Sequence, residues 1–243
     1  MSQDQEILKE SVPYQDTSKA IFKGESWNVL GRSALGHDIT GKVLSGSKNA
    51  KKALLIGGVH GNETEGIRFM EEFVREFALE SSTSPCNCEI FVLPVFNPDG
   101  FLGFYRGNGN KVDLNRNMPT KDWTSSCSEI KYFPGSRAAS EPETSIMTKL
   151  VDEYKPDFII SFHSWKPMIN INGPAQEYAE AMKISMDMEI VEDIGYPTPG
   201  SLGTYAGWER KIPTITLEFE RGVPLNSIYP YSRQAVLNAL NLL

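Results

Sequence analysis

Two histidines and a glutamate have the residue types and the spacing of a metal site. His60 and Glu63 lie in the segment HGNE, directly after an apolar run, and His163 ends a second apolar run much later in the chain. Two imidazoles and one carboxylate, with one coordination position left open, are a typical ligand set for catalytic zinc. Each histidine alone would also fit a structural role. The matching placement of the two histidines, with Glu63 close by, favours the metal site.

Further polar residues could act on a substrate beside such a metal ion. Glu218 lies near the end of the apolar run TITLEFE, and a carboxylate there is costly to bury unless it is paired or functional. It is either a solvent-facing strand residue or a general base for water. Asn115 and Arg116, in DLNRN, combine an amide with a planar guanidinium that suits bidentate capture of a carboxylate. Arg106 and Arg116 could each also be an ordinary loop charge.

The elements that position these residues can be predicted from hydrophobic periodicity. Continuous apolar runs predict buried strands, and apolar residues at helical spacing predict amphipathic helices. We expect a hairpin over 28–46, strands over 51–59, 88–96, 155–164 and 212–220, a turn at 97–100, and helices over 1–22, 65–80, 140–154, 176–188 and 225–243. Ser140 and Glu143 have the spacing of a capping box at the start of one helix. The alternation of strands and helices predicts an α/β fold in a single domain over residues 1–243.

The composition excludes several classes of partner. Lysine and arginine number 24 against 31 aspartates and glutamates, a net charge of −7, so no basic excess exists to neutralise nucleic-acid or lipid phosphates. No run approaches the roughly 18 apolar residues that span a bilayer, and the first residues lack the features of a secretory signal. Three cysteines, an odd number, fit reduced thiols better than a disulfide framework. We therefore expect a cytoplasmic protein that binds neither nucleic acid nor membrane, and a homodimer stays open.

Taken together, these residues resemble the zinc carboxypeptidase family, the carboxypeptidase A-like metallopeptidases. The family pattern is H-x-x-E, an arginine, N-R, a lone histidine and a late glutamate, and this chain has the same residue types in the same order over roughly residues 50–225. Within the family, the segments GGVHGNETEG, SEPET, PGSLGTYAGW and IPTITLEF are similar to those of the short bacterial murein peptide amidases. The resemblance implies an αβα sandwich with a mixed, mostly parallel central sheet. It also implies hydrolysis of the γ-D-glutamyl–meso-diaminopimelate bond of a murein tripeptide in peptidoglycan recycling.

The resemblance further implies a role for each residue at the metal. His60, Glu63 and His163 would bind one zinc ion per chain. Glu218 would act as the general base, and Arg106 would stabilise the negatively charged oxygen of the intermediate.

The same resemblance implies how the substrate is held. Asn115 and Arg116 would bind the carboxylate of the terminal residue, and a mobile tyrosine would close over it. Tyr196 and Tyr205 both precede the late glutamate, and the glycines and prolines around Tyr196 favour it.

Two other functions stay open. An N-acyl amino acid deacylase of the aspartoacylase or succinylglutamate desuccinylase type shares motifs like HGNE and DLNR, whereas SEPET and TITLEFE favour the peptidase. A non-catalytic murein-peptide binder on the same fold would have a broken metal set, and here the set is intact.

Overall fold

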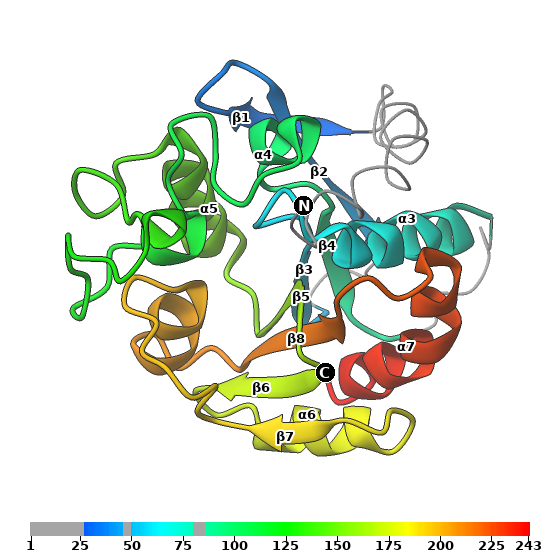
Figure 1. Ribbon diagram of the computed structural model, residues 1–243. Helices are drawn as coiled ribbons and strands as arrows, with labels where there is room; N and C mark the ends of the chain where they lie inside the picture. Colours follow the sequence, from blue (N-terminus) through cyan, green and yellow to red (C-terminus); the bar gives the residue numbers. More distant parts are fainter. Residues whose placement is uncertain (1–26, 46–49, 80–85) are drawn as a thin grey trace.

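A mixed sheet of eight strands runs through the centre of the molecule (Figure 1). The computed structural model describes residues 27–45, 50–79 and 86–243. The strands are β1 (Asn28–Arg32), β2 (Asp38–Ser45), β3 (Lys52–Ile56), β4 (Glu89–Leu93), β5 (Phe158–Trp165), β6 (Met168–Asn172), β7 (Glu189–Val191) and β8 (Thr214–Glu220). They lie in the order β1-β2-β4-β3-β5-β8-β6-β7. The predicted hairpin and strands are confirmed, and β6 and β7 are additional.

The middle of this sheet is parallel. β3 pairs in parallel with β4 and β5, and β5 pairs in parallel with β8. Towards the edges, β2 pairs with β1 and β4, and β6 pairs with β8, in antiparallel fashion, whereas β6 and β7 are parallel. Parallel strands are buried on both faces, which explains why β3 and β5 are near-continuous apolar runs, whereas β8 alternates apolar residues with threonines and glutamates. Their carboxyl ends meet at one edge of the sheet, where ligands bind in α/β proteins.

Helices cover both faces of the sheet (Figure 1). They are α3 (Thr64–Leu79), α4 (Pro98–Gly103), α5 (Pro142–Tyr154), α6 (Gln176–Lys183), α7 (Leu225–Leu240) and the π-helix η3 (Gly203–Trp208). Residues of α3, α6 and α7 belong to one hydrophobic core, and residues of α5 and η3 belong to a second. Successive residues of β3 alternate between the two cores, with Ala53 and Leu55 in the first and Leu54 and Ile56 in the second. The expected αβα sandwich with a mixed sheet is therefore confirmed.

The predicted capping box at the start of α5 is wrong. The N-cap of α5 is Glu141, and its side chain makes no capping hydrogen bond. Ser140 Oγ donates to Glu141 Oε1 over 2.6 Å. Glu143 Oε1 instead accepts from the backbone N–H of Ala34, between β1 and β2, over 2.9 Å. The two side chains that would have capped the helix are thus used by Glu141 and by the distant Ala34 instead.

The structure also differs from the predictions at two other segments. The expected turn at 97–100 is the first part of α4, because Asn97 caps that helix by accepting from Gly100 N over 2.9 Å. The helix expected over 176–188 ends at Lys183 as α6. The helix expected over 1–22 lies outside the described residues.

Candidate metal centre and active site

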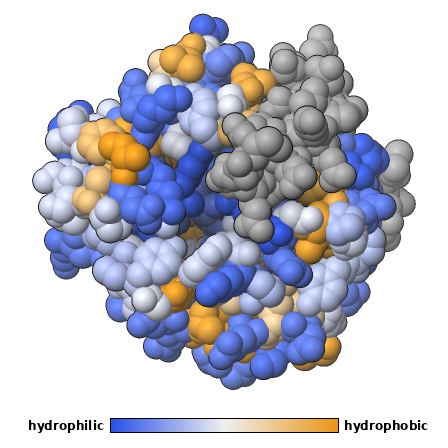
Figure 2. Space-filling view, viewed as in Figure 1, coloured by the Kyte–Doolittle hydropathy of each residue, from blue (hydrophilic) through white to orange (hydrophobic). Residues whose placement is uncertain are grey.

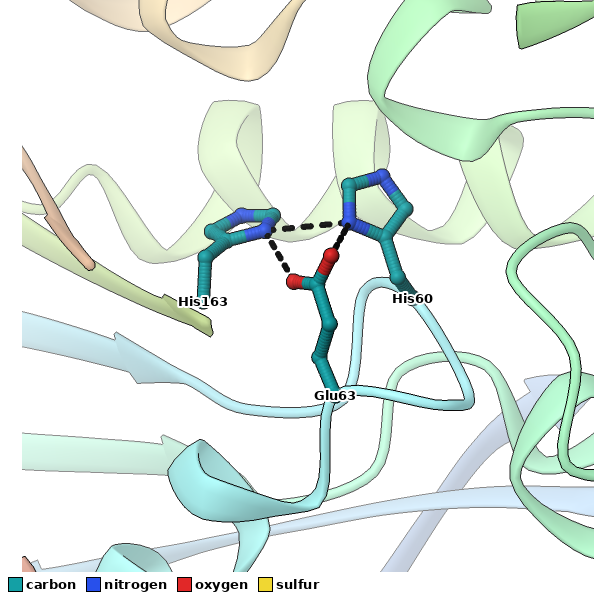
Figure 3. Close-up of side chains that lie close together, drawn as sticks. All are labelled: His60, Glu63 and His163. Carbon is teal, nitrogen blue, oxygen red and sulfur yellow. Dashed lines mark hydrogen bonds and ion pairs between the residues drawn. The ribbon is translucent and has the colours of Figure 1, made fainter. Parts of the chain in front are cut away.

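The predicted metal ligands converge at the carboxyl edge of the sheet (Figure 3). His60 and Glu63 lie on the loop between β3 and α3, and His163 lies in β5. All of these side chains are buried. His60 Nδ1 lies 2.9 Å from Glu63 Oε1 and 3.2 Å from His163 Nδ1, and His163 Nδ1 lies 3.0 Å from Glu63 Oε2. The structure thus brings together two ligands from one turn and a third from a distant strand.

These separations fit a tetrahedral zinc ion. Zinc lies about 2.05 Å from a histidine nitrogen, so two ligand atoms at the tetrahedral angle are about 3.3 Å apart. The two Nδ1 atoms are 3.2 Å apart, close to that value, and the nitrogen–oxygen distances of 2.9 and 3.0 Å are slightly shorter. Burial alone would raise the pKa of Glu63, but His60 and His163 outweigh it and lower the pKa well below its usual range. The group can therefore hold one zinc ion with an ionised carboxylate and little movement.

The outer nitrogen of each imidazole is anchored. His60 Nε2 lies 3.0 Å from Asp113 Oδ1, and His163 Nε2 lies 3.0 Å from Ser161 Oγ. Burial alone would raise the pKa of Asp113, but Arg106 and His60 outweigh it and hold the pKa well below its usual range. An ionised Asp113 accepts a proton carried on Nε2, which leaves Nδ1 of His60 as the ligand atom.

A close approach between two loops fixes the backbone at the metal ligands. A Cβ atom added to Gly61 would lie 1.8 Å from the carbonyl carbon of Gly100 in α4. Gly61 N also donates to the carbonyl oxygen of Arg106 over 3.3 Å. Only glycine allows this approach, so any side chain at position 61 would displace the loop that carries His60 and Glu63.

Glu218 lies beside the metal ligands, where a general base is expected. In the pairing of β5 with β8, Glu218 is directly opposite His163. Its Oε2 atom is buried and has no hydrogen-bond partner among the described residues. Burial, opposed by His163 and reinforced by Glu63, raises the pKa of Glu218 to about 7. A carboxyl group with such a pKa can take up and return a proton at neutral pH.

His60, Glu63, His163 and Glu218 all line a cavity of about 540 Å³. Figure 2 shows hydrophilic side chains around a hollow near the centre of the visible face. Arg106 lines the cavity and is tied to the metal group, since its Nε donates to Asp113 Oδ2 over 2.9 Å and its Nη1 lies 3.3 Å from Glu63 Oε1. The guanidinium of Arg106 therefore stays next to the position that a metal ion would occupy.

Asn115 and Arg116 line another part of the cavity. Asn115 Oδ1 accepts from Leu202 N over 2.9 Å, which orients the side-chain amide and leaves its NH₂ group to donate. Arg116 Nη1 donates to Asn115 O over 2.7 Å, and the guanidinium lies 5.5 Å from the centroid of the Tyr132 ring. Among the ion pairs of the described residues, Arg106 takes part in two and Arg116 in none. The guanidinium of Arg116 is thus available to a carboxylate of a ligand.

The two candidate tyrosines have different surroundings. Tyr196 lines the cavity and packs edge to face on Trp165, with ring centroids 5.7 Å apart. Tyr205 is 1% exposed in the second hydrophobic core, and the guanidinium of Arg210 lies over its ring. Of the two, Tyr196 is the one placed to meet a substrate.

Sequence reasoning alone does not find several residues of the site. In the sequence, Asp113 looks like an ordinary loop carboxylate. Its position directly before the segment Leu114–Arg116 could have indicated that it belongs to the site. Asn170 and Asn172 line the cavity from β6, and their alternation would have pointed to one face of a strand if the short segment MININ had been recognised as one. Arg221 also lines the cavity, but an arginine after a strand carries no signal of its own.

The fold and the site together define a metal-dependent hydrolase. Its metal ligands, a carboxylate poised to transfer a proton and guanidinium groups for anions share one cavity at the carboxyl ends of parallel strands. Among family models, the one described as zinc carboxypeptidase matches residues 19–234. The chain therefore belongs to the zinc carboxypeptidase family, and the expected class of enzyme, a zinc-dependent metallopeptidase or amidase, is confirmed.

Individual relatives agree with this assignment. Murein peptide amidase A of Vibrio campbellii is 30% identical over 229 residues, which cover 89% of this chain and 87% of the relative. The protein of the same name from Escherichia coli K12 is 30% identical over 201 residues, 78% of this chain and 79% of the relative. The crystal structure of the murein-tripeptide amidase from Escherichia coli O157 is 27% identical with a TM-score of 0.71, covering 93% of this chain and 95% of that one.

More distant structures share the fold. Carboxypeptidase A of Helicoverpa armigera is 18% identical with a TM-score of 0.71, covering 97% of this chain and 69% of that one.

In the described part of the chain, no helix has the length and apolar character needed to cross a bilayer.

Proposed function

We propose that this protein hydrolyses the γ-D-glutamyl–meso-diaminopimelate bond of the murein tripeptide L-Ala-γ-D-Glu-meso-diaminopimelate. The observation that carries the proposal is the buried group of His60, Glu63 and His163 in a polar cavity with Glu218 beside it. Relatives of almost the same length that are 30% identical bear the name murein peptide amidase A. We assign the metal ligands and Glu218 to this reaction.

The chain's own residues supply the proton transfers and the charge stabilisation. A zinc ion held by the ligand group would supply Lewis-acid chemistry, making a water molecule more acidic and the carbonyl carbon of the substrate more electrophilic. Glu218, directly opposite His163 in the pairing of β5 with β8, takes the proton of the attacking water and returns it to the leaving amine. Arg106, held beside Glu63 and Asp113, donates to the carbonyl oxygen as negative charge develops there.

The terminal carboxylate of the substrate is held by the side-chain amide of Asn115 and the guanidinium of Arg116. Asn115 donates through its side-chain NH₂ group, and Arg116 supplies the positive charge that has no ion-pair partner among the described residues. Tyr196 lies in the same cavity and covers the bound terminal residue. Such an anchor makes the enzyme act at the last bond of a peptide, because an internal residue has no carboxylate there.

The surroundings of the terminal residue favour a polar side chain. The cavity is lined there by Asn170, Asn172, Ser201, Thr204 and Thr216. Gly203 allows Asn172 to lie against η3, since a Cβ atom at that position would lie 2.3 Å from Asn172 Oδ1. Uncharged donors and acceptors suit the distal amino and carboxylate groups of diaminopimelate better than an apolar side chain.

A cytoplasmic location and a place in peptidoglycan recycling are part of the same proposal. The odd number of cysteines, three, fits reduced thiols better than a disulfide framework and supports a reducing compartment. Fractionation of cells that produce the protein tests the location, and recovery of the active enzyme outside the cytoplasm would contradict it.

A substrate comparison with zinc-loaded protein tests the proposed reaction. We expect diaminopimelate to be released from the murein tripeptide, little hydrolysis of N-acetyl-aspartate, and one zinc ion per chain by metal analysis. Hydrolysis of N-acetyl-aspartate alone would indicate the deacylase instead. Correctly folded protein that binds no zinc would indicate a non-catalytic binder.

A further inference from the structure

Arg221 is a further cationic group of the cavity, in addition to Arg106, Arg116 and Lys131. It directly follows β8, and its backbone N–H donates to the carbonyl oxygen of Trp165 at the end of β5 over 3.3 Å. Its Nη2 donates to the carbonyl oxygen of Asn62 over 3.0 Å. Because Asn62 lies between His60 and Glu63 in the sequence, these bonds hold the guanidinium beside the metal loop.

The charge of Arg221 is not neutralised by a neighbour. Among the described residues, no carboxylate forms an ion pair with Arg221, whereas Lys131 at the same cavity is paired with Glu129. The Arg221 side chain is exposed and lines the cavity. A guanidinium of this kind can donate from its remaining N–H groups to a carboxylate of a ligand.

The side chain of Asn62 offers the opposite polarity next to it. Asn62 lines the cavity, and its Oδ1 atom is buried without a hydrogen-bond partner among the described residues. A buried acceptor without a donor is costly unless a ligand supplies one. Arg221 and Asn62 therefore present a donor for an anion and an acceptor for an N–H group side by side.

The proposed substrate carries this pair of groups on one carbon atom. A glutamyl residue linked through its side chain keeps its α-carboxylate free, and the same carbon carries the N–H of the preceding peptide bond. We propose that Arg221 binds this α-carboxylate, with Asn62 accepting from the N–H, and that the enzyme thereby selects peptides with a free carboxylate on the residue before the scissile bond. The inference rests on the proposed function, and it adds a requirement on the acyl side of the bond.

A pair of tripeptides that differ in one group tests the inference. One has the free α-carboxylate on D-glutamate, and the other has a carboxamide in its place. We expect the wild-type enzyme to cleave the carboxylate form with a kcat/KM about tenfold higher, as for a hydrogen bond to a charged group. Arg221→Gln should bring this ratio close to one, and Arg221→Lys should retain part of it. Arg137→Gln, a matched change at an exposed arginine outside the cavity lining, should keep the wild-type ratio.

The outcomes separate this role from others. Arg221 also favours the ionised form of Glu218 and so lowers its pKa; if that is its role, Arg221→Gln slows both peptides equally and shifts the pH profile while the ratio stays the same. That result, or a wild-type ratio near one, would overturn the inference and leave the proposed function standing. Wild-type enzyme that contains zinc and cleaves neither peptide would overturn the proposed function itself. Zinc content of each variant shows that the metal loop is intact.

Discussion

Replacing Glu218 with glutamine is expected to abolish turnover and yet to stabilise the metal-free protein at alkaline pH. The carboxyl group is needed to transfer a proton, but its ionised form is poorly accommodated. Its Oε2 atom is buried without a partner among the described residues, and burial together with the charge of Glu63 raises its pKa to about 7 against the opposing effect of His163. Glutamine has the same shape and no charge, so it removes this cost together with the base. Zinc binding should be kept, since Glu218 is not one of the ligands.

The size of the effect follows from the pKa of Glu218. The value of about 7 in the folded protein compares with 4.5 for an unperturbed glutamate, and the difference corresponds to about 3 kcal/mol at about 1.4 kcal/mol per pH unit. Because the folded-state pKa is the higher one, the folded protein binds the proton more tightly than the unfolded chain. This contribution to stability is complete below the unfolded pKa and is lost as the pH rises to about 7. The advantage of the glutamine variant should therefore grow from about 1 kcal/mol near pH 5 to about 3 kcal/mol near pH 8.

Urea unfolding of chelator-treated protein at the two pH values measures this difference. Glu220→Gln is the matched control, because Glu220 is an exposed carboxylate on the same strand, and its replacement should change the free energy of unfolding little at either pH. A Glu218→Gln variant that is less stable than wild type near pH 8, or whose advantage does not change with pH, would refute the reasoning. Retained hydrolysis by that variant would remove Glu218 as the base.

Further changes test other parts of the site. Asp113→Asn should weaken zinc binding by about 10- to 100-fold, because it removes the carboxylate that orients His60; competition with a chelator measures this, and an unchanged affinity contradicts the role. Arg116→Ala should raise KM more than it lowers kcat, since it removes the carboxylate anchor; steady-state kinetics with an unchanged KM would count against the anchor. Gly61→Ala should cost about 2 kcal/mol or more in unfolding free energy, because its Cβ would lie 1.8 Å from the Gly100 carbonyl carbon; a wild-type melting temperature would show that the loops are free to separate.

Much of the fold and the metal group could be predicted because the relevant signals are local. Strands β3 and β5 are buried on both faces and are near-continuous apolar runs, β8 alternates apolar and polar residues, and parallel pairing brings the carboxyl ends of these strands together. His60 and His163 could be recognised as partners because each follows or ends such a run. Glu218 could be placed near them because it lies late in the last of these strands. In the structure it is directly opposite His163.

The remaining features depend on contacts between distant segments. Ser140 and Glu143 have the spacing of a capping box, but Glu143 is used by Ala34, which is far away in the sequence. Strand β6 is short and its partner β8 is distant in the sequence, so the strand is hard to recognise, and the alternation of the asparagines that it brings to the cavity is missed with it. Tyr196 and Tyr205 both lie upstream of Glu218, and the glycines and prolines around Tyr196 favour it; only the structure shows that Tyr205 is buried in the second hydrophobic core while Tyr196 lines the cavity.

The central claim is that the metal group of His60, Glu63 and His163 directs water to the carbonyl carbon between glutamate and diaminopimelate. Mass spectrometry of the products formed by zinc-loaded enzyme in heavy-oxygen water tests it most directly. We predict unlabelled diaminopimelate and an L-Ala-D-Glu dipeptide that carries one heavy oxygen in the side-chain carboxylate of its glutamate, with no product after removal of zinc and recovery when zinc is restored. Cleavage between alanine and glutamate, or an intact tripeptide after incubation with folded, zinc-loaded enzyme, would contradict it.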